Sequence, residues 1–211
     1  MTRATAAVIV AHPDDEILWA GGTIISRPQW TWLISALCRA GDADRAPRFE
    51  RVVKRLGAEG LIGNLDDGPE QNPLSDYEVQ EAVSFLVPKV RFGVVLTHGP
   101  RGEYTRHRRH GEVCRAVVGL WKAGKIITDS LWMFAYEDGG GQYLPRAEEN
   151  AHRRESLSDE TWHEKYRIIT ELYGFDPQSW EARATPRVEA FWCFESPEMA
   201  QAFIDQKGTE R

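Results

Sequence analysis

Short apolar runs alternate with amphipathic stretches along most of this 211-residue chain, and this alternation limits the possible folds more than any other feature. Strands are predicted at residues 5–10, 30–38, 60–65, 92–97, 130–136 and 188–194. Helices are predicted at residues 17–25, 44–56, 75–86, 107 or 108 to 122, and 160–173, with a last helix opening at Ser196. Strands and helices that alternate at this spacing form βαβ units. The sequence therefore predicts an α/β fold with a mostly parallel sheet covered by helices on both faces.

Local signals mark several helix boundaries. Gly57 is typical of a residue that ends a helix. Ser75 and Glu78 have the spacing of a capping box at the start of the next helix. Gly21 and Gly22 are expected to interrupt the first helix.

Residues 138–158 differ from the rest of the chain. They begin with Asp138 and three consecutive glycines and contain few large apolar side chains. A stretch of this length without periodicity is long for a connection in a compact domain. Two interpretations stay open, a mobile lid over a site and a disordered surface loop. The chain length favours a single domain over residues 1–211.

Charge, hydropathy and cysteine pattern exclude several classes of protein. The net charge of −6 argues against a nucleic-acid partner, because such proteins normally carry a basic excess. The longest apolar run, residues 6–11, is too short for a membrane span, and the N-terminus lacks a signal-peptide pattern. Cys38, Cys114 and Cys193 lie far apart and form no CxxC pair. Buried free thiols in a reducing cytoplasm are therefore expected.

The first chemical motif, AHPDDE, follows the first predicted strand at residues 11–16. Sites in parallel sheets form beyond the carboxyl ends of the strands. His12 and Asp15 can converge in a tight turn, and imidazole with carboxylate suits Zn²⁺, with Fe²⁺ or Mn²⁺ as alternatives. Asp14 would then lie beside the metal, able to take a proton from water. The other interpretation is a plain helix start, in which the acidic residues favour the positive end of the helix dipole.

The second motif follows the strand predicted at 92–97 and contains His98, His107 and His110. His107 and His110 lie one helical turn apart on the same side. His110 lies along the inward edge of its helix, where it can be the third ligand of a tetrahedral site with one open position. His107 would stand close by as an electrophile or an acid. The alternative is a basic surface run, and His98 is expected to pack at the strand end.

Together and in this order, the two motifs resemble those of a known family. AHPDDE, THGPRGEYTRHRRH and the LG that ends the intervening helix are similar to the LmbE-like, or PIG-L-type, zinc-dependent N-deacetylases. The resemblance covers most of residues 4–136. It implies a Rossmann-like three-layer sandwich, one zinc ion, and removal of an N-acetyl group from an N-acetylglucosamine-type sugar or conjugate.

The resemblance also implies roles for individual residues. The implied zinc ligands are His12, Asp15 and His110. Asp14 would be the general base, and His107 would polarise the acetyl carbonyl or its oxyanion.

Two further residues are implied to contact the sugar. Arg45, with Arg48 as the alternative, and Asp67 match positions near the sugar in the family. The family commonly has Pro-Asp between its two histidines, where this chain has Arg108 and Arg109. Two cations at this point make an anionic substrate more plausible.

The leading hypothesis is therefore metal-assisted hydrolysis of an N-acetylated amino sugar or conjugate. An amidase for a non-sugar amide, or for an antibiotic or thiol precursor, is the alternative enzyme. A non-catalytic sugar- or nucleotide-binding domain is the alternative from another class. The first strand lacks the GxGxxG pattern, and the acidic residues after it repel pyrophosphate, which argues against this binding domain.

Overall fold

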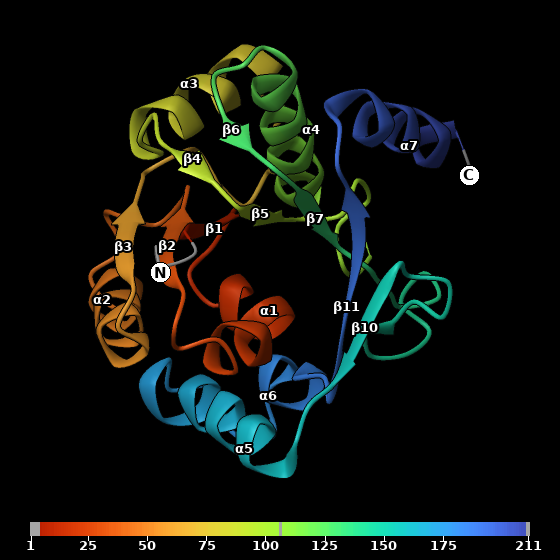
Figure 1. Ribbon diagram of the computed structural model, residues 1–211. Coiled ribbons are helices and arrows are strands. Elements are labelled where there is room, and N and C mark those ends of the chain that lie inside the picture. Colours follow the sequence, from red (N-terminus) through yellow and green to blue (C-terminus); the bar gives the residue numbers. More distant parts are fainter. Residues whose placement is uncertain (1–4, 106, 210–211) are drawn as a thin grey trace.

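The computed structural model describes residues 5–105 and 107–209 and shows a seven-stranded sheet with helices on both faces (Figure 1). The strand order is β10-β11-β7-β5-β1-β2-β3. The parallel strands are β1 (Thr5–Val10), β2 (Thr31–Ala36), β3 (Glu59–Ile62), β5 (Val94–Thr97) and β7 (Leu131–Phe134). β11 (Val188–Phe194) pairs antiparallel with β7, and β10 (Arg153–Ser156) pairs antiparallel with β11 and completes one edge. The predicted α/β fold with a mostly parallel sheet is confirmed.

The helices form one layer on each face of this sheet (Figure 1). The layer on one face contains α3 (Asp76–Leu86), α4 (Arg108–Lys122) and α7 (Pro197–Thr209). The layer on the other face contains α1 (Asp15–Ile25), α2 (Arg45–Leu56), α5 (Asp159–Arg167), the π-helix η1 (Ile168–Leu172) and α6 (Trp180–Ala184). Successive side chains of a strand point to opposite faces, so Val8 packs with the second layer and Ile9 with the first.

Two short ladders lie outside the main sheet. β4 (Arg91–Phe92) pairs with β6 (Ile127–Thr128) in parallel. β8 (Tyr136–Glu137) pairs with β9 (Arg146–Ala147) in antiparallel. The strand predicted at 92–97 is therefore divided at Gly93, between β4 and β5.

The helix boundaries follow two of the three predicted signals. Gly57 ends α2 with φ of 65°, a conformation that glycine adopts without strain. Ser75 caps α3 and forms the predicted capping box with Glu78. The interruption expected at Gly21 and Gly22 is wrong, because α1 is continuous through both. A Cβ on Gly22 would lie 2.3 Å from the Leu157 side chain, so this glycine allows a close approach instead.

The C-terminal half departs most from the prediction. The helix predicted at 160–173 changes to a π-helix at Ile168, and the helix α6 was not predicted. Residues 138–158 contain β9 and β10, although no regular structure was expected there. β10 is a polar edge strand, RRES, with mostly exposed side chains, so no apolar periodicity marks it. The role of residues 138–158 as a lid stays a prediction.

The cysteine and membrane predictions can be compared with the structure directly. Cys38, Cys114 and Cys193 are free thiols, the first two buried. Cys193 is only partly buried, so the expectation of three buried thiols is wrong at this position. Among residues 5–105 and 107–209, no helix has the length and apolar character that crossing a membrane requires.

A buried ion pair joins α1, α5 and β11. Lys165 Nζ lies 2.6 Å from Glu189 Oε1, and both side chains are 0% exposed. The Glu189 carboxylate also accepts hydrogen bonds from the backbone N–H groups of Gly22 and Thr23 and from the Thr23 hydroxyl. Because a cation and three N–H or O–H donors surround the Glu189 carboxylate, its charge is tolerated away from water.

Lys165→Met is expected to lower the free energy of unfolding by about 3–5 kcal/mol, because it leaves the Glu189 charge buried without a cation. Urea unfolding followed by tryptophan fluorescence measures the change. Arg91→Met is the matched control, since the Arg91–Asp129 pair is 70% and 52% exposed. We expect the control to cost less than about 1 kcal/mol. Equal losses in the two variants would contradict this account.

Candidate metal centre

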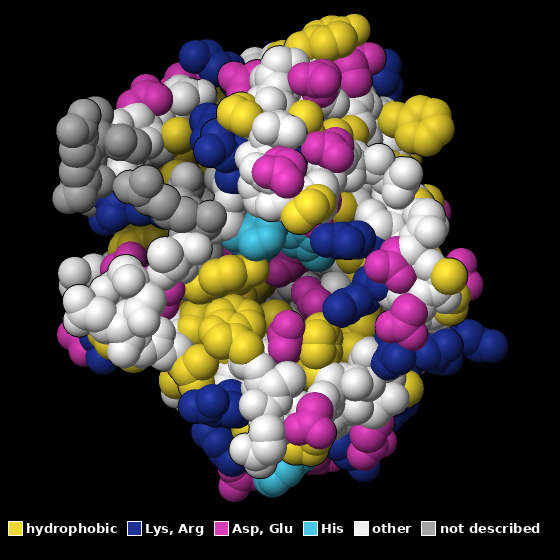
Figure 2. Space-filling model, turned by 180° about the vertical axis from the view of Figure 1, so that it is seen from behind, with side chains coloured by type: hydrophobic (Ala, Val, Ile, Leu, Met, Phe, Trp, Pro, Cys, Tyr) yellow, Lys and Arg dark blue, Asp and Glu magenta, His cyan; other side chains and the backbone are white. Residues whose placement is uncertain are grey.

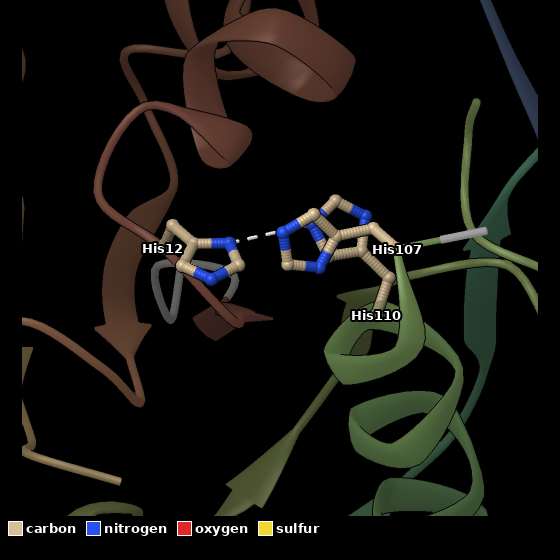
Figure 3. Close-up of side chains that lie close together, drawn as sticks. All are labelled: His12, His107 and His110. Carbon is tan, nitrogen blue, oxygen red and sulfur yellow. Dashed lines mark hydrogen bonds between the residues drawn. The ribbon is translucent and has the colours of Figure 1, made fainter. Parts of the chain in front are cut away.

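Two loops meet at the carboxyl edge of the parallel strands and bring the two sequence motifs together. His12 and Asp15 follow β1, and His110 lies in the first turns of α4, which follows β5. His12 faces the pair His107 and His110 across a short gap (Figure 3). The convergence that the sequence suggested is therefore present in the structure.

Three of these side chains present their ligand atoms at nearly equal spacing. His12 Nδ1 lies 3.1 Å from Asp15 Oδ2, His110 Nε2 lies 3.4 Å from the same oxygen, and the two nitrogens are 3.3 Å apart. A tetrahedral zinc ion with bonds of about 2.0–2.1 Å requires ligand atoms about 3.3–3.4 Å apart. The three atoms therefore fit one face of a tetrahedron, with the fourth corner left for water or substrate.

Glu103 holds the Nδ1 side of both His98 and His110, and the backbone of Ala11 decides which of the two histidines keeps a free Nε2. The Ala11 N–H donates to His98 Nε2 at 2.9 Å, so this nitrogen is already occupied, and His98 Nδ1 lies 2.9 Å from Glu103 Oε2. His98 is packed at the strand end, as predicted. Glu103 Oε2 also lies 2.6 Å from His110 Nδ1. A proton on Nδ1 leaves the lone pair of His110 Nε2 pointing to the centre, as in carboxylate–histidine–metal sites.

Asp67 lies beside His12 and makes an ion-pair contact with its imidazole. Its Oδ1 lies 3.2 Å from His12 Nε2, the nitrogen that faces away from the other ligand atoms. Arg39 and Gln71 hold the same carboxylate from the other side. Asp67 thus lines the cavity and contacts His12 directly, and its predicted contact with the sugar stays a prediction.

Neighbouring groups of opposite charge shift the pKa values of His110 and Asp15 in this cluster. Burial lowers the pKa of His110, but Asp15 and Glu103 outweigh burial and raise it to about 9. Burial raises the pKa of Asp15, but His110 and His98 outweigh it and hold the pKa well below its usual range. The cluster is therefore an anionic centre that attracts protons. A divalent cation at the same point would displace protons from the imidazoles.

Asp14 sits beside this centre on a strained backbone. Its φ is 115°, which a residue with a Cβ rarely adopts. Glu16 Oε2 accepts the Asp14 N–H at 3.0 Å, and the Tyr173 hydroxyl donates to Glu16 Oε1. Burial and the charge of Asp15 raise the pKa of Asp14 well above its ordinary value. Strain of this kind persists only where the surroundings enforce it, and it is typical of functional sites.

Of the two arginines proposed to contact the sugar, Arg45 is the one that reaches Asp14. Its Nη1 lies 2.6 Å from Asp14 Oδ2, and its guanidinium lies over the Phe175 ring at 4.6 Å. Arg48 instead pairs with Asp44 and with the carbonyl oxygen of Tyr173. Of the two alternatives, the structure therefore brings Arg45 to Asp14 and the neighbouring cavity.

His107 stacks against His110, with ring centroids 4.4 Å apart, and meets His12 edge to face at 4.6 Å. Burial, and then the neighbouring His110, lower the pKa of His107 to about 3, so its imidazole is neutral near pH 7. Its Nδ1 is buried and has no hydrogen-bond partner among the described residues. A neutral imidazole with an unused nitrogen can bind an oxygen or a donor on a ligand.

A cavity of about 300 Å³ opens onto this cluster. Figure 2 shows a hollow with histidine and acidic side chains inside, hydrophobic side chains along one side and basic side chains along the other. The cavity is lined by His12, Pro13, Asp14, Asp15, Leu18, Arg39, Asp42, Arg45, Asp67, Tyr104, His107, Trp180 and Glu181. Its size and mixture of apolar and polar groups are typical of a small-molecule site.

The two arginines between the histidines do not form one basic patch. Arg109 is buried, pairs with Glu112 and donates to the carbonyl oxygen of Asn72. It therefore ties α4 to the loop before α3. Arg108 is exposed. At most one of the two arginines can therefore place a positive charge near the substrate, where the sequence suggested two.

Several residues of the site were not predicted from the sequence. Glu103 and Glu16 were not singled out, although each contacts a predicted site residue. Tyr173 and Phe175 follow η1, and Trp180 begins α6. No motif marks this segment, because its contribution depends on contacts between parts of the chain that are far apart in sequence.

No family model and no curated protein matches the chain in sequence. Solved structures do match it in fold. The N,N'-diacetylchitobiose deacetylase from Pyrococcus horikoshii, solved with its inhibitor MPG, is 14% identical with a TM-score of 0.64, over 90% of this chain and 84% of that one. The zinc-inhibited form of teicoplanin deacetylase Orf2 is 12% identical with a TM-score of 0.55, over 81% and 84%.

The same fold also occurs in a protein with another activity. The 4-carboxy-2-hydroxymuconate hydratase GalB from Pseudomonas putida KT2440 is 15% identical with a TM-score of 0.57, over 85% of this chain and 82% of that one. Likeness at such identities concerns the fold and leaves the reaction open. The chain thus has the Rossmann-type α/β fold of the LmbE-like deacetylases, with a group of histidine and aspartate side chains that can hold a metal ion at its sheet edge.

Proposed function

We propose that this protein is a metal-dependent hydrolase that removes an acetyl group from the nitrogen of an N-acetylglucosamine-type sugar or conjugate. The triangle formed by His12 Nδ1, Asp15 Oδ2 and His110 Nε2 carries the proposal, because its edges of 3.1–3.4 Å suit a tetrahedral metal. The strained Asp14 beside it, and the deacetylase names of two proteins with the same fold, support the proposal.

Zinc is the metal that we propose, with Fe²⁺ or Mn²⁺ as alternatives. Two imidazole nitrogens and one carboxylate oxygen are a donor set that zinc accepts in catalytic sites. When bound, the metal supplies a Lewis acid at this corner of the cavity.

Asp14 has the position and the proton affinity of a general base. Its raised pKa favours uptake of a proton from the attacking water, and Arg45 holds its Oδ2 in place. The water oxygen forms a bond to the acetyl carbon, and the bond from that carbon to nitrogen breaks. Asp14 then returns the proton to the departing amine, so the products are acetate and the free amino sugar.

His107 is proposed to bind the acetyl oxygen. Its imidazole is neutral because its pKa is lowered to about 3, and a neutral ring still has one N–H to donate. A donor fixed in advance at the point where negative charge develops lowers the barrier of such reactions.

Acetate release from a panel of N-acetylated amino sugars and their glycosides tests this function. We expect at least one panel member to be hydrolysed, with activity that disappears after chelation and returns with added zinc. Acyclic N-acetylamines in the same panel detect an amidase for non-sugar amides. A protein that takes up no metal and hydrolyses no member would contradict the proposal and favour a non-catalytic binding domain.

Asp14→Asn is expected to lower kcat by about 10²–10⁴-fold, because the amide cannot accept the proton from water. The bound metal, measured by elemental analysis, should stay at the wild-type level. Asp159→Asn is the control, since Asp159 lies in α5 and is 82% exposed. Turnover of Asp14→Asn close to wild type would exclude Asp14 as the base.

Glu103→Gln is expected to weaken zinc binding by about 10–100-fold, because the amide no longer attracts the proton on His110 Nδ1. Competition with a coloured chelator measures the affinity. Glu112→Gln is the matched control. Glu112 lies on α4 and is buried, as Glu103 is, but it pairs with Arg109 and not with a histidine. An unchanged affinity in folded Glu103→Gln protein would show that Glu103 does not support a metal ligand.

A further inference from the structure

The cavity beside the metal centre has two chemically different walls. Arg39 and Asp42, after β2, and Arg45, at the start of α2, contribute charged groups. Tyr104, after β5, and Trp180, at the start of α6, contribute aromatic rings. Figure 2 shows the same division, with hydrophobic side chains on one side of the hollow and basic ones on the other.

The aromatic wall is continuous with the metal centre. The Trp180 and Tyr104 ring centroids are 4.6 Å apart at an angle of 58°. Tyr104 in turn meets His107 and His110 edge to face, at 5.9 and 5.5 Å. A ligand with its acetyl group at His107 would therefore extend along Tyr104 toward Trp180.

Trp180 keeps part of its apolar surface open at this point. Trp180 is 37% exposed although its ring packs against Tyr104. Among the described residues, the other exposed aromatic side chains line no wall of this cavity: Tyr77 and Phe85 on α3, and Tyr143 between β8 and β9. An exposed ring inside a cavity is available for a ligand, and covering it is favourable by the hydrophobic effect.

We propose that Trp180 is a specificity-determining residue that packs against the apolar face of the substrate's sugar ring. The inference rests on the proposed function. A pyranose ring presents C–H groups on its faces and hydroxyl groups around its edge. The Trp180 ring packs against the C–H groups of one face. The charged groups of Arg39, Asp42 and Arg45 hydrogen-bond to the hydroxyl groups at the edge. Trp180 thereby makes the protein prefer cyclic N-acetylated amino sugars to acyclic N-acetylamines.

Two substrates and three variants test this role. N-acetylglucosamine, or the best glycoside of the panel, has the ring face, whereas N-acetylethanolamine has the same amide without it. We expect Trp180→Ala to raise KM for the sugar about tenfold, because contact with the ring face is lost, with kcat changed less than about threefold. KM for N-acetylethanolamine should stay constant. Trp180→Phe should restore much of the sugar affinity, and Phe85→Ala should leave both substrates unaffected.

Calorimetry separates this proposal from the proposed function. N-acetylglucosamine is titrated into the zinc-loaded Asp14→Asn protein, with and without Trp180→Ala. A dissociation constant raised about tenfold by Trp180→Ala supports the role of Trp180 even if no acetate is ever released. Equal affinities, or no binding in either protein, overturn it. An equal loss of activity toward both substrates also overturns it, because Trp180 would then only support Tyr104.

Discussion

The buried carboxylate of Asp15 is the group on which the rest of the site depends. Its Oδ2 accepts the His12 N–H at 3.0 Å and lies close to imidazole nitrogens of His12 and His110, while Oδ1 accepts the Trp19 Nε1–H at 3.1 Å. A carboxylate removed from water is stable only among donors and positive charges. Asp15 therefore fixes the loop after β1 against the first turns of α4, and the cavity forms between them.

Elements of the fold that are determined by their own residues could be predicted from the sequence. Elements that are held by distant parts of the chain could not. β1 is apolar on both faces, and α3 begins at its own capping box, so both appear in the sequence. β10 is polar and is held by pairing with β11, whose partner residues lie more than thirty positions away, as in Arg153 opposite Phe191. Strands defined by such long-range pairing leave little pattern in the local sequence.

The same distinction applies to the candidate site. His12, Asp15 and His110 could be predicted because each lies in a motif directly after a central strand. The groups that orient them could not. Glu16 and Tyr173 are 157 positions apart, yet their hydrogen bond helps to set the backbone of Asp14. Residues 168–184 thus complete a site whose recognisable motifs all lie between residues 11 and 110.

The positive φ of Asp14 sets folding stability against the activity that we propose for its side chain. Glycine adopts such an angle without strain, so it would suit the backbone there better than aspartate does. It would also remove the carboxylate that faces Arg45. Variants selected for heat resistance alone would therefore tend to lose this side chain, and a search for more stable forms of the protein should hold residue 14 constant.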